Sequence, residues 1–185
     1  MIVAIGGYAR AGKDTFGNQL VSKAQFKRLA FADSLKGALL ATDPYVSPDG
    51  VRLSDALELT GGWEEIKGST YGPEVRRLLQ KMGTEGMRNH AGDRVWIDAL
   101  LSKVLKDYHS DFVVTDVRMR DELTAMKEIG AITIWVERPG VGPVNAHVSD
   151  NTLRPSDFDF TILNVSTDEA MYNQFLRLLN DSMVK

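Results

Sequence analysis

The chain has 185 residues, 43% of them hydrophobic, so it can bury one substantial core but is short for two independent ones. Its formal net charge of −3, from 22 Lys and Arg against 25 Asp and Glu, argues against the basic surface that duplex nucleic acid requires. The absence of cysteine excludes disulfides and thiolate metal sites. With no signal peptide and no apolar run of about 18 residues, we expect a single-domain cytoplasmic protein, 1–185, with no nucleic-acid or membrane partner.

The predicted elements alternate, in chain order, between short apolar runs and segments of helical periodicity. This alternation is typical of a parallel sheet covered by helices on both faces, so we predict an α/β fold with a five-stranded, mainly parallel sheet. Strands are expected at residues 2–5, 28–31, 112–116, 132–136 and, least clearly, 159–163. The apolar faces of the helices are expected at Phe16 and Leu20, at Val75, Leu78, Leu79 and Met82, at Ile97, Leu101, Val104 and Leu105, at Met119, Leu123 and Met126, and at Met171, Phe175, Leu178 and Leu179.

The first predicted strand leads into the sequence GGYARAGKDT at residues 6–15. Gly7, Gly12 and Lys13 have the spacing of a P-loop, although Asp14 replaces the usual Ser or Thr and the hydroxyl follows at Thr15. Glycines let backbone N–H groups surround a phosphate, the following helix N-terminus adds a partial positive charge, and the lysine adds a full one. The segment therefore predicts a phosphate-binding loop. Between its glycines this loop also contains Ala9, Arg10 and Ala11.

One competing motif uses the same residues. Residues 7–12 also match a variant of the dinucleotide-binding fingerprint, and Asp33 lies about 20 residues further on, at the end of the second predicted strand. Ala9 stands where that fingerprint has a glycine for close approach of a pyrophosphate, and Lys13 would have no role there. The P-loop is therefore the preferred interpretation, and a dinucleotide-dependent oxidoreductase is the alternative.

Two carboxylates are candidate magnesium ligands. Asp14 would repel a triphosphate unless Mg²⁺ or water lay between them, so we expect it to bind the metal directly or through water. The alternative for Asp14 is an acidic residue favoured by the helix dipole. Asp116 ends the third strand run, at the edge where open parallel sheets bind ligands, and it either assists magnesium or caps the next helix. The three histidines have no second ligand at metal spacing.

Several arginines lie where a phosphate clamp would need them. Arg118 and Arg120 directly follow the third strand run, although Arg120 fits a solvated helix position nearly as well. Arg77 lies off the apolar face of a predicted helix, and Arg88 follows the polar sequence that ends it, so each fits a polar pocket as well as a solvated face. We expect residues 42–92, between the second and third strands, to be an insertion that grips a second substrate.

Taken together, the segments GGYARAGKDT, LAFADSLK, VRRLLQKMGTEGMR, VWIDAL, VVTDVRMRDE and HVSD resemble the deoxynucleoside monophosphate kinases of tailed bacteriophages, from residue 1 to about 165. The resemblance implies a three-layer α/β/α P-loop kinase fold with a helical acceptor-binding insertion. It also implies transfer of the γ-phosphoryl group of ATP to a deoxynucleoside monophosphate with Mg²⁺, in the host cytoplasm for a phage-encoded chain. The part from DVRMRDE to DFDFTILN is also similar to animal phosphomevalonate kinases. A phosphomevalonate kinase or other small-molecule kinase is therefore the alternative function, followed by a P-loop switch NTPase.

The resemblance also implies roles for single residues. ATP would be held by Gly7, Ala9, Arg10, Ala11, Gly12, Lys13, Asp14 and Thr15. Asp116 and Arg118 would lie near the transferring group. The acceptor site would contain Asp33, Lys36, Arg77, Thr84, Glu85, Arg88 and Trp96. Residues 137–150 would form a short lid-like loop, with Arg138 and then Arg154 as candidate lid cations.

The chain departs from the family pattern at two places and leaves its oligomeric state open. Met119-Arg120-Asp121-Glu122 stands where the family often has Phe-Pro-Asn-Glu, and Ser34 replaces a frequent proline. A homodimer is possible by analogy with related kinases. Leu57, Leu59 and Trp63 would line either the subunit contact or, as we expect, a local core.

Overall fold

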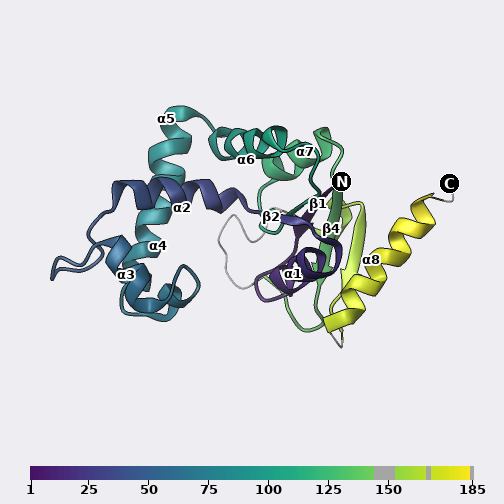
Figure 1. Ribbon diagram of the computed structural model, residues 1–185, viewed down its shortest axis with the longest axis horizontal. Coiled ribbons are helices and arrows are strands. Elements are labelled where there is room, and N and C mark those ends of the chain that lie inside the picture. The colour runs from purple at the N-terminus through teal and green to yellow at the C-terminus, as the bar shows by residue number, and fades with distance from the viewer. Residues whose placement is uncertain (144–152, 166–167, 184–185) are drawn as a thin grey trace. The chain divides into compact units, whose positions relative to one another are not determined.

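The computed structural model describes residues 1–143, 153–165 and 168–183 (Figure 1). The chain forms two compact units, one made of Met1–Phe31 and Leu100–Lys185 and the other of Ala32–Ala99. The second unit includes more residues than the insertion expected at residues 42–92. Of the expected lid-like loop, residues 144–150 lie outside the described residues, and with them His147 and the HVSD segment.

A five-stranded, fully parallel sheet with the order β2-β3-β1-β4-β5 forms the centre of the first unit. Its strands are β1 (Ile2–Gly6), β2 (Lys27–Leu29), β3 (Phe112–Val114), β4 (Ile132–Glu137) and β5 (Phe160–Leu163). The prediction of five strands is confirmed. The sequence could predict them because strands buried on both faces read as continuous apolar runs. The second strand, however, ends at Leu29 and Phe31 begins helix α2 (Phe31–Thr42), so Asp33 lies in a first helical turn rather than at a strand end.

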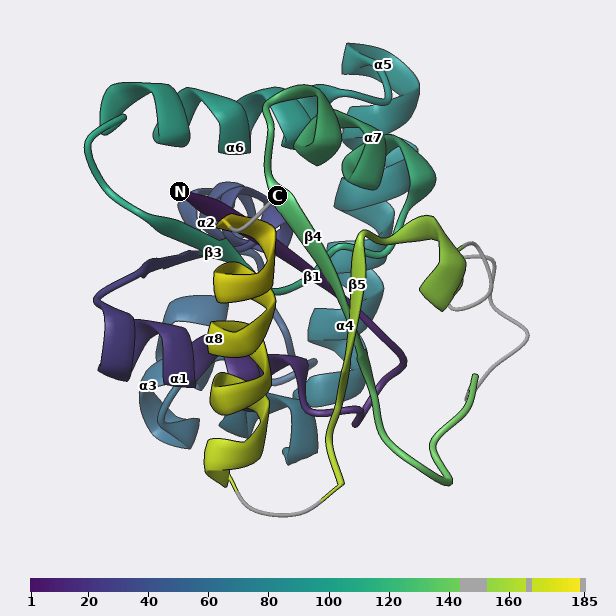
Figure 2. The same ribbon diagram turned by 90° about the vertical axis from the view of Figure 1, so that its right-hand side faces the viewer.

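Helices cover both faces of this sheet (Figure 2). On one face α1 (Lys13–Ala24) packs against α8 (Asp168–Met183), where the rings of Phe16 and Phe175 lie 5.9 Å apart. The opposite face carries α7 (Arg120–Glu128) and the later part of α6 (Val95–Lys106). Successive strand residues alternate between the two layers, which explains why β1, β3 and most of β4 are apolar. The three-layer α/β/α architecture is confirmed.

The second unit is helical. Between α2 and α6 it contains α3 (Leu53–Thr60), a 3₁₀ turn η1 (Glu65–Gly68), α4 (Gly72–Gln80), a π-helix η2 (Lys81–Arg88) and α5 (Asn89–Ala91). Its core contains Leu39, Val46, Leu53, Ala56, Ile66 and Val75. Leu57 and Trp63 pack against this core, as expected of a local core, whereas Leu59 is 71% exposed.

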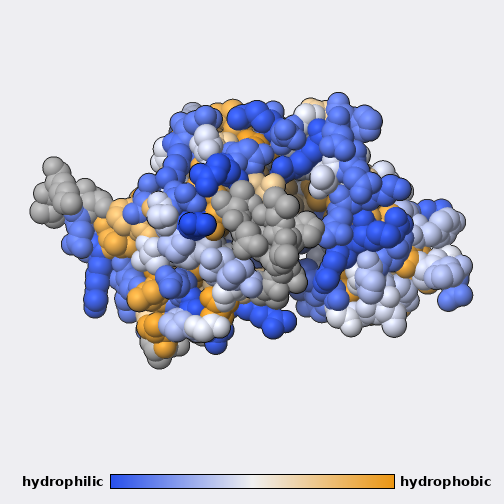
Figure 3. Space-filling model, turned by 180° about the vertical axis from the view of Figure 1, so that it is seen from behind, coloured by the Kyte–Doolittle hydropathy of each residue, from blue (hydrophilic) through white to orange (hydrophobic). Residues whose placement is uncertain are grey.

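Exposed apolar side chains are scattered over the surface. Leu105 and Tyr108 are, with Leu59, the most exposed of them among the described residues. On the face seen in Figure 3, apolar residues form small patches separated by polar ones, as is ordinary for protein surfaces. Within the described ranges, no helix is both long enough and apolar enough to span a membrane. The scattered apolar patches do not test the homodimer, which stays a prediction.

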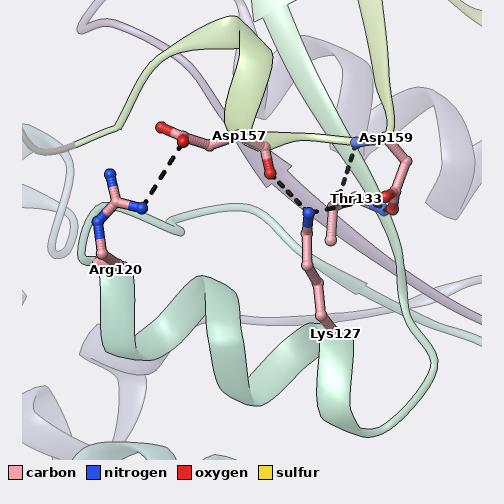
Figure 4. Close-up of polar contacts among 5 residues, drawn as sticks. All are labelled: Arg120, Lys127, Thr133, Asp157 and Asp159. Carbon is pink, nitrogen blue, oxygen red and sulfur yellow. Dashed lines mark hydrogen bonds and ion pairs between the residues drawn. The ribbon is translucent and has the colours of Figure 1, made fainter.

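A polar cluster ties α7 to the segment that precedes β5 (Figure 4). Lys127 Nζ donates to the carbonyl oxygen of Asp157 at 2.7 Å and lies 3.7 Å from Asp159 Oδ1. Asp159 Oδ2 accepts hydrogen bonds from the backbone N and the Oγ1 of Thr133, at 2.9 and 2.7 Å. Arg120 Nη1 lies 3.7 Å from Asp157 Oδ1. The 3₁₀ turn η4 (Pro155–Asp157) is thus held against α7.

Acid should weaken this cluster through Asp159. Partial burial acts to raise the pKa of Asp159, but the hydrogen bonds from Thr133 and the charge of Lys127 outweigh it, so the pKa lies below its ordinary value. Such a carboxylate stabilises the fold above its unfolded-state pKa of about 3.9, and the contribution is lost as the pH falls through the lower folded-state pKa.

We therefore expect the free energy of unfolding to fall more steeply below about pH 4 in the parent chain than in Asp159→Asn. Urea denaturation at a series of pH values measures both. Because the side chain of Asp159 is 43% exposed, the difference should stay below about 1 kcal/mol. Parallel pH profiles would show that Asp159 contributes nothing.

Candidate active site

The loop between β1 and α1 adopts a conformation that its glycines make possible. Gly7 has φ 146° and Gly12 has φ 102°, in the region that favours glycine. A Cβ on Gly7 would lie 2.5 Å from the carbonyl oxygen of Val136, and one on Gly12 would collide with the side chain of Asn164. Asn164 Nδ2 in turn donates to the Ala11 carbonyl at 2.9 Å. The loop is therefore fastened to the ends of β4 and β5.

Helix α1 begins at Lys13 directly after this loop. Gly12 is its N-cap residue and has no side chain that could occupy the N–H groups of the first turn. Asp14 and Thr15 lie exposed in that turn. An uncapped helix N-terminus behind a glycine-rich loop is a suitable place for a phosphate group.

Lys13 reaches back over the first half of the loop. Its Nζ donates to the carbonyl oxygens of Gly7 and Tyr8, each at 2.8 Å. Lys13 and Arg118 also line one pocket. The other lining residues are Gly7, Tyr8, Ala9, Val117, Trp135 and Leu153. Two cations in one pocket of a chain with net charge −3 make a local site for an anion.

Two aromatic rings, those of Tyr8 and Trp135, line this pocket, and no sequence motif marks them. Trp135 is 2% exposed, and its ring lies 5.1 Å from that of Tyr8 and 5.3 Å from that of Phe158. A Cβ on Gly6 would overlap the Phe158 ring. The apolar pattern of β4 does not separate a residue of the pocket wall from a core residue, so no sequence signal distinguished Trp135.

Asp116 has a structural role at the start of α2. Its Oδ1 accepts a hydrogen bond from the backbone N of Phe31 at 2.8 Å, at the start of α2. Asp116 therefore caps a helix, as one interpretation of the sequence had it, but the helix is α2 and not the next one in the chain. The next helix, α7, is capped by Glu122. Capping of α2 does not test a magnesium role for Asp116, which stays a prediction.

Glu122 is a second residue that the sequence analysis passed over. Its Oε2 accepts hydrogen bonds from the backbone N of Arg118 at 2.9 Å and of Met119 at 3.0 Å. Such backward reach from the third residue of a helix to its N-cap is half of a capping box. The usual signal, Ser or Thr at the N-cap, is absent because Met119 stands there.

All seven residues implied for the acceptor site lie in the second unit. Thr84, Glu85 and Arg88 are on the π-helix η2, an element that occurs often at functional sites. Lys36 of α2 has its Nζ 5.5 Å from the ring centre of Trp63. The sequence predicts Trp63 only as part of a local core or of a subunit contact.

The guanidinium of Arg77 is engaged by Glu74. The two side chains form a fork of hydrogen bonds at 2.8 and 2.6 Å, which lowers the pKa of Glu74 and raises that of Arg77. Both lie one turn apart on α4. Arg138, expected as a lid cation, follows β4 and is exposed. Neither observation tests the implied roles of Arg77 and Arg138.

Trp96 is buried, 7% exposed, and its indole Nε1 donates to the carbonyl oxygen of Gly83 at 3.1 Å. Gly83 is itself buried in η2, where a Cβ would press on Leu35 at 2.9 Å. Trp96 thus stabilises the π-helix η2 through the carbonyl of Gly83. Contact of Trp96 with an acceptor stays a prediction.

Trp96→Phe keeps a large ring but removes this donor. Leaving the buried Gly83 carbonyl without its partner should lower the free energy of unfolding by about 1–3 kcal/mol. Chemical denaturation followed by circular dichroism measures the change. Trp63→Phe, which removes an indole that has no such bond among the described residues, is the control. Equal stability of parent and Trp96→Phe would contradict this role.

Comparison with known structures supports the fold. The crystal structure of shikimate kinase from Aquifex aeolicus aligns with 100% of this chain and 99% of its own, with a TM-score of 0.52 and 14% sequence identity. This likeness shows the fold, which is that of the P-loop kinases, and it does not test the dinucleotide-binding alternative for the first loop.

Comparison with known sequences identifies the family. Residues 46–175 match the family described as deoxynucleotide monophosphate kinase. A homologue of that name from Acanthamoeba polyphaga mimivirus is 26% identical over 98% of this chain and 97% of its own length. The deoxynucleotide monophosphate kinases of Escherichia phage RB69 and Enterobacteria phage T4 are 26% and 29% identical over 73% and 57% of this chain, and the matches span 61% and 45% of those proteins. The chain belongs to the deoxynucleotide monophosphate kinase family.

Proposed function

We propose that the protein transfers the γ-phosphoryl group of ATP to a deoxynucleoside monophosphate, which yields ADP and a deoxynucleoside diphosphate. Family membership supports a kinase that acts on a nucleotide, and phosphomevalonate kinase and switch-NTPase functions are not favoured. The structural observation that carries the proposal is the pairing of Lys13 and Arg118 in one pocket beside the glycine loop.

This arrangement suits phosphoryl transfer between two phosphates. Such a reaction needs its two anions held in line and their charge offset, with little covalent help from the protein. Backbone N–H groups of the loop and of the first turn of α1 would hold the donor phosphates, and Thr15 would contact a phosphate oxygen. Lys13 would bind the γ-phosphoryl group, and Arg118 would offset charge as that group moves. An oxygen of the acceptor phosphate is the nucleophile, so no nucleophilic side chain is required.

Asp14 would hold Mg²⁺ directly or through water, and Asp116 would assist through water. The described residues contain no group of three or more His, Cys, Asp and Glu that could hold a metal by themselves. That suits Mg²⁺, which usually keeps several waters and binds through one or two carboxylates together with substrate phosphates. When bound, Mg²⁺ offsets negative charge on the β- and γ-phosphates.

The acceptor would bind in the second unit. Arg88 and Thr84 on η2 would contact its phosphate, while Lys36 and Asp33 on the first turns of α2 would contact its phosphate or sugar. Trp63, beneath the Lys36 ammonium, is a further candidate for contact with the base.

A coupled assay for ADP release tests the function. ATP and Mg²⁺ would be offered with a panel of deoxynucleoside monophosphates, ribonucleoside monophosphates and phosphomevalonate. We expect strong stimulation by one or more deoxynucleotides. ATP binding with no stimulation by any member of the panel would overturn the proposal.

Lys13→Ala should fold and lose nearly all turnover, because Lys13 is the residue proposed to bind the γ-phosphoryl group. We expect kcat to fall by at least about 100-fold, as when a preorganised donor is removed. Lys23→Ala is the matched control, since Lys23 lies in the last turn of the same helix and pairs with Glu169 at 2.8 Å. Comparable kcat in Lys13→Ala and the parent would sink the assignment of Lys13.

Arg88→Ala should raise the KM for the acceptor by about 10-fold, the cost of one charged hydrogen bond, and change the KM for ATP much less. Initial rates with each substrate varied in turn measure both constants. Arg94→Ala, which removes an exposed arginine 3.6 Å from Asp98, is the control. Equal effects on both Michaelis constants would remove Arg88 from the acceptor site.

A further inference from the structure

We infer that Glu122 is a positioning residue for Arg118, and that it acts on turnover by fixing the backbone from which the arginine extends. The inference deepens the proposed function, on which it rests, because Arg118 matters only if the pocket transfers phosphate.

The carboxylate of Glu122 is buried and directed at the backbone around Arg118. Glu122 is 6% exposed, although an ionised carboxylate is rarely buried unless its oxygens are hydrogen-bonded. One of its oxygens, Oε2, accepts from two consecutive backbone N–H groups, those of Arg118 and Met119. The two bonds fix the peptide planes on either side of the arginine Cα. The side chain of Arg118 is itself exposed and lines the pocket with Lys13.

The same turn is fixed from its other side by the central strand. The backbone N of Val117 donates to the carbonyl oxygen of Ile5 at 3.2 Å, and Val117 is 1% exposed. Ile5 is followed by Gly6 and Gly7, where the phosphate-binding loop begins. Three consecutive N–H groups, from Val117 to Met119, are therefore held, the first by β1 and the other two by Glu122. These bonds fix the backbone of Arg118 relative to the start of the glycine loop.

Helix α7, which carries Glu122, is anchored in its turn. Arg120 and Lys127 bind Asp157 from the first and last turns of α7 (Figure 4). Asp157 ends the short segment that begins at Leu153, another residue of the pocket wall. Glu122 therefore transmits the position of a fixed helix to the backbone of Arg118.

This arrangement has a kinetic consequence. Misplacement of a charge-offsetting group by about 1 Å can cost about 100-fold in rate, because the interaction is needed most in the transition state. Glu122→Ala removes the carboxylate oxygen that accepts from both backbone N–H groups, and it should lower kcat by about 10- to 100-fold, with less than about a threefold change in the KM for ATP. Glu122→Gln keeps an acceptor oxygen and should retain kcat within about threefold.

A merely structural helix cap is separated by a matched control. Asp43 caps α3, where its two oxygens accept from the backbone N and the Oγ of Ser54 at 2.8 and 3.0 Å. Asp43→Ala thus also removes a carboxylate that accepts two hydrogen bonds at a helix start. Assayed well below all melting temperatures, Asp43→Ala should keep kcat near the parent value while Glu122→Ala loses it. A lowered melting temperature with unchanged kcat in Glu122→Ala would overturn the inference. If Glu122→Ala does not fold, Glu122→Asp, which keeps the charge but is one methylene shorter, takes its place.

A double-mutant cycle shows whether Glu122 acts through Arg118. If it does, Glu122→Ala combined with Arg118→Ala should be no more than about twofold slower than Arg118→Ala alone. Losses that multiply would overturn the inference, since Glu122 would then act independently. Parental turnover in Arg118→Ala would overturn it as well, because no arginine function would remain to be positioned. The kinase function would in that case still stand or fall on the ADP-release panel and Lys13→Ala.

Discussion

The close approach of the first loop to the neighbouring strand is the constraint on which the candidate active site depends. At Gly7 the backbone passes so near the Val136 carbonyl that a Cβ would lie 2.5 Å from it. At Gly12 the side chain of Asn164 fills the space that a Cβ would need and fastens the Ala11 carbonyl. The loop is therefore held between β1, β4 and β5, and under the proposed function its N–H groups would meet an incoming phosphate without first having to be ordered.

The topology of the sheet explains how the two cations of the pocket come together. β1 is the central strand, and the loop after it presents Lys13 at the start of α1. β3 is its parallel neighbour, so the segment after β3 leaves the same edge of the sheet and carries Arg118. The hydrogen bond from the backbone N of Val117 to the carbonyl oxygen of Ile5 joins the segment after β3 to the end of β1. Residues far apart in sequence thus share one pocket because both strands end at the same edge.

Parts of this architecture could be predicted because they depend on local pattern. Buried parallel strands are apolar throughout, and the glycines and lysine of the loop have fixed spacing, so strands and loop were located to within two residues. Trp135, Glu122 and the π-helix η2 could not be predicted. A strand pattern does not say which apolar residue borders a pocket, the capping role of Glu122 has no Ser or Thr to mark it, and η2 depends on the distant Trp96 indole. The helix capped by Asp116 was missed for the same reason, since Phe31 is distant in sequence.

The hydrogen bonds of Lys13 allow the loop to be ordered before the proposed phosphate binds. The ammonium donates to the Gly7 and Tyr8 carbonyls at 2.8 Å, so it stabilises the turn that it serves. Both acceptors are neutral, whereas a phosphate oxygen carries negative charge and attracts the ammonium more strongly. Under the proposed function, Lys13 would exchange these carbonyl partners for phosphate oxygens. The loop stays fixed meanwhile, because its glycine contacts and Asn164 do not involve the ammonium.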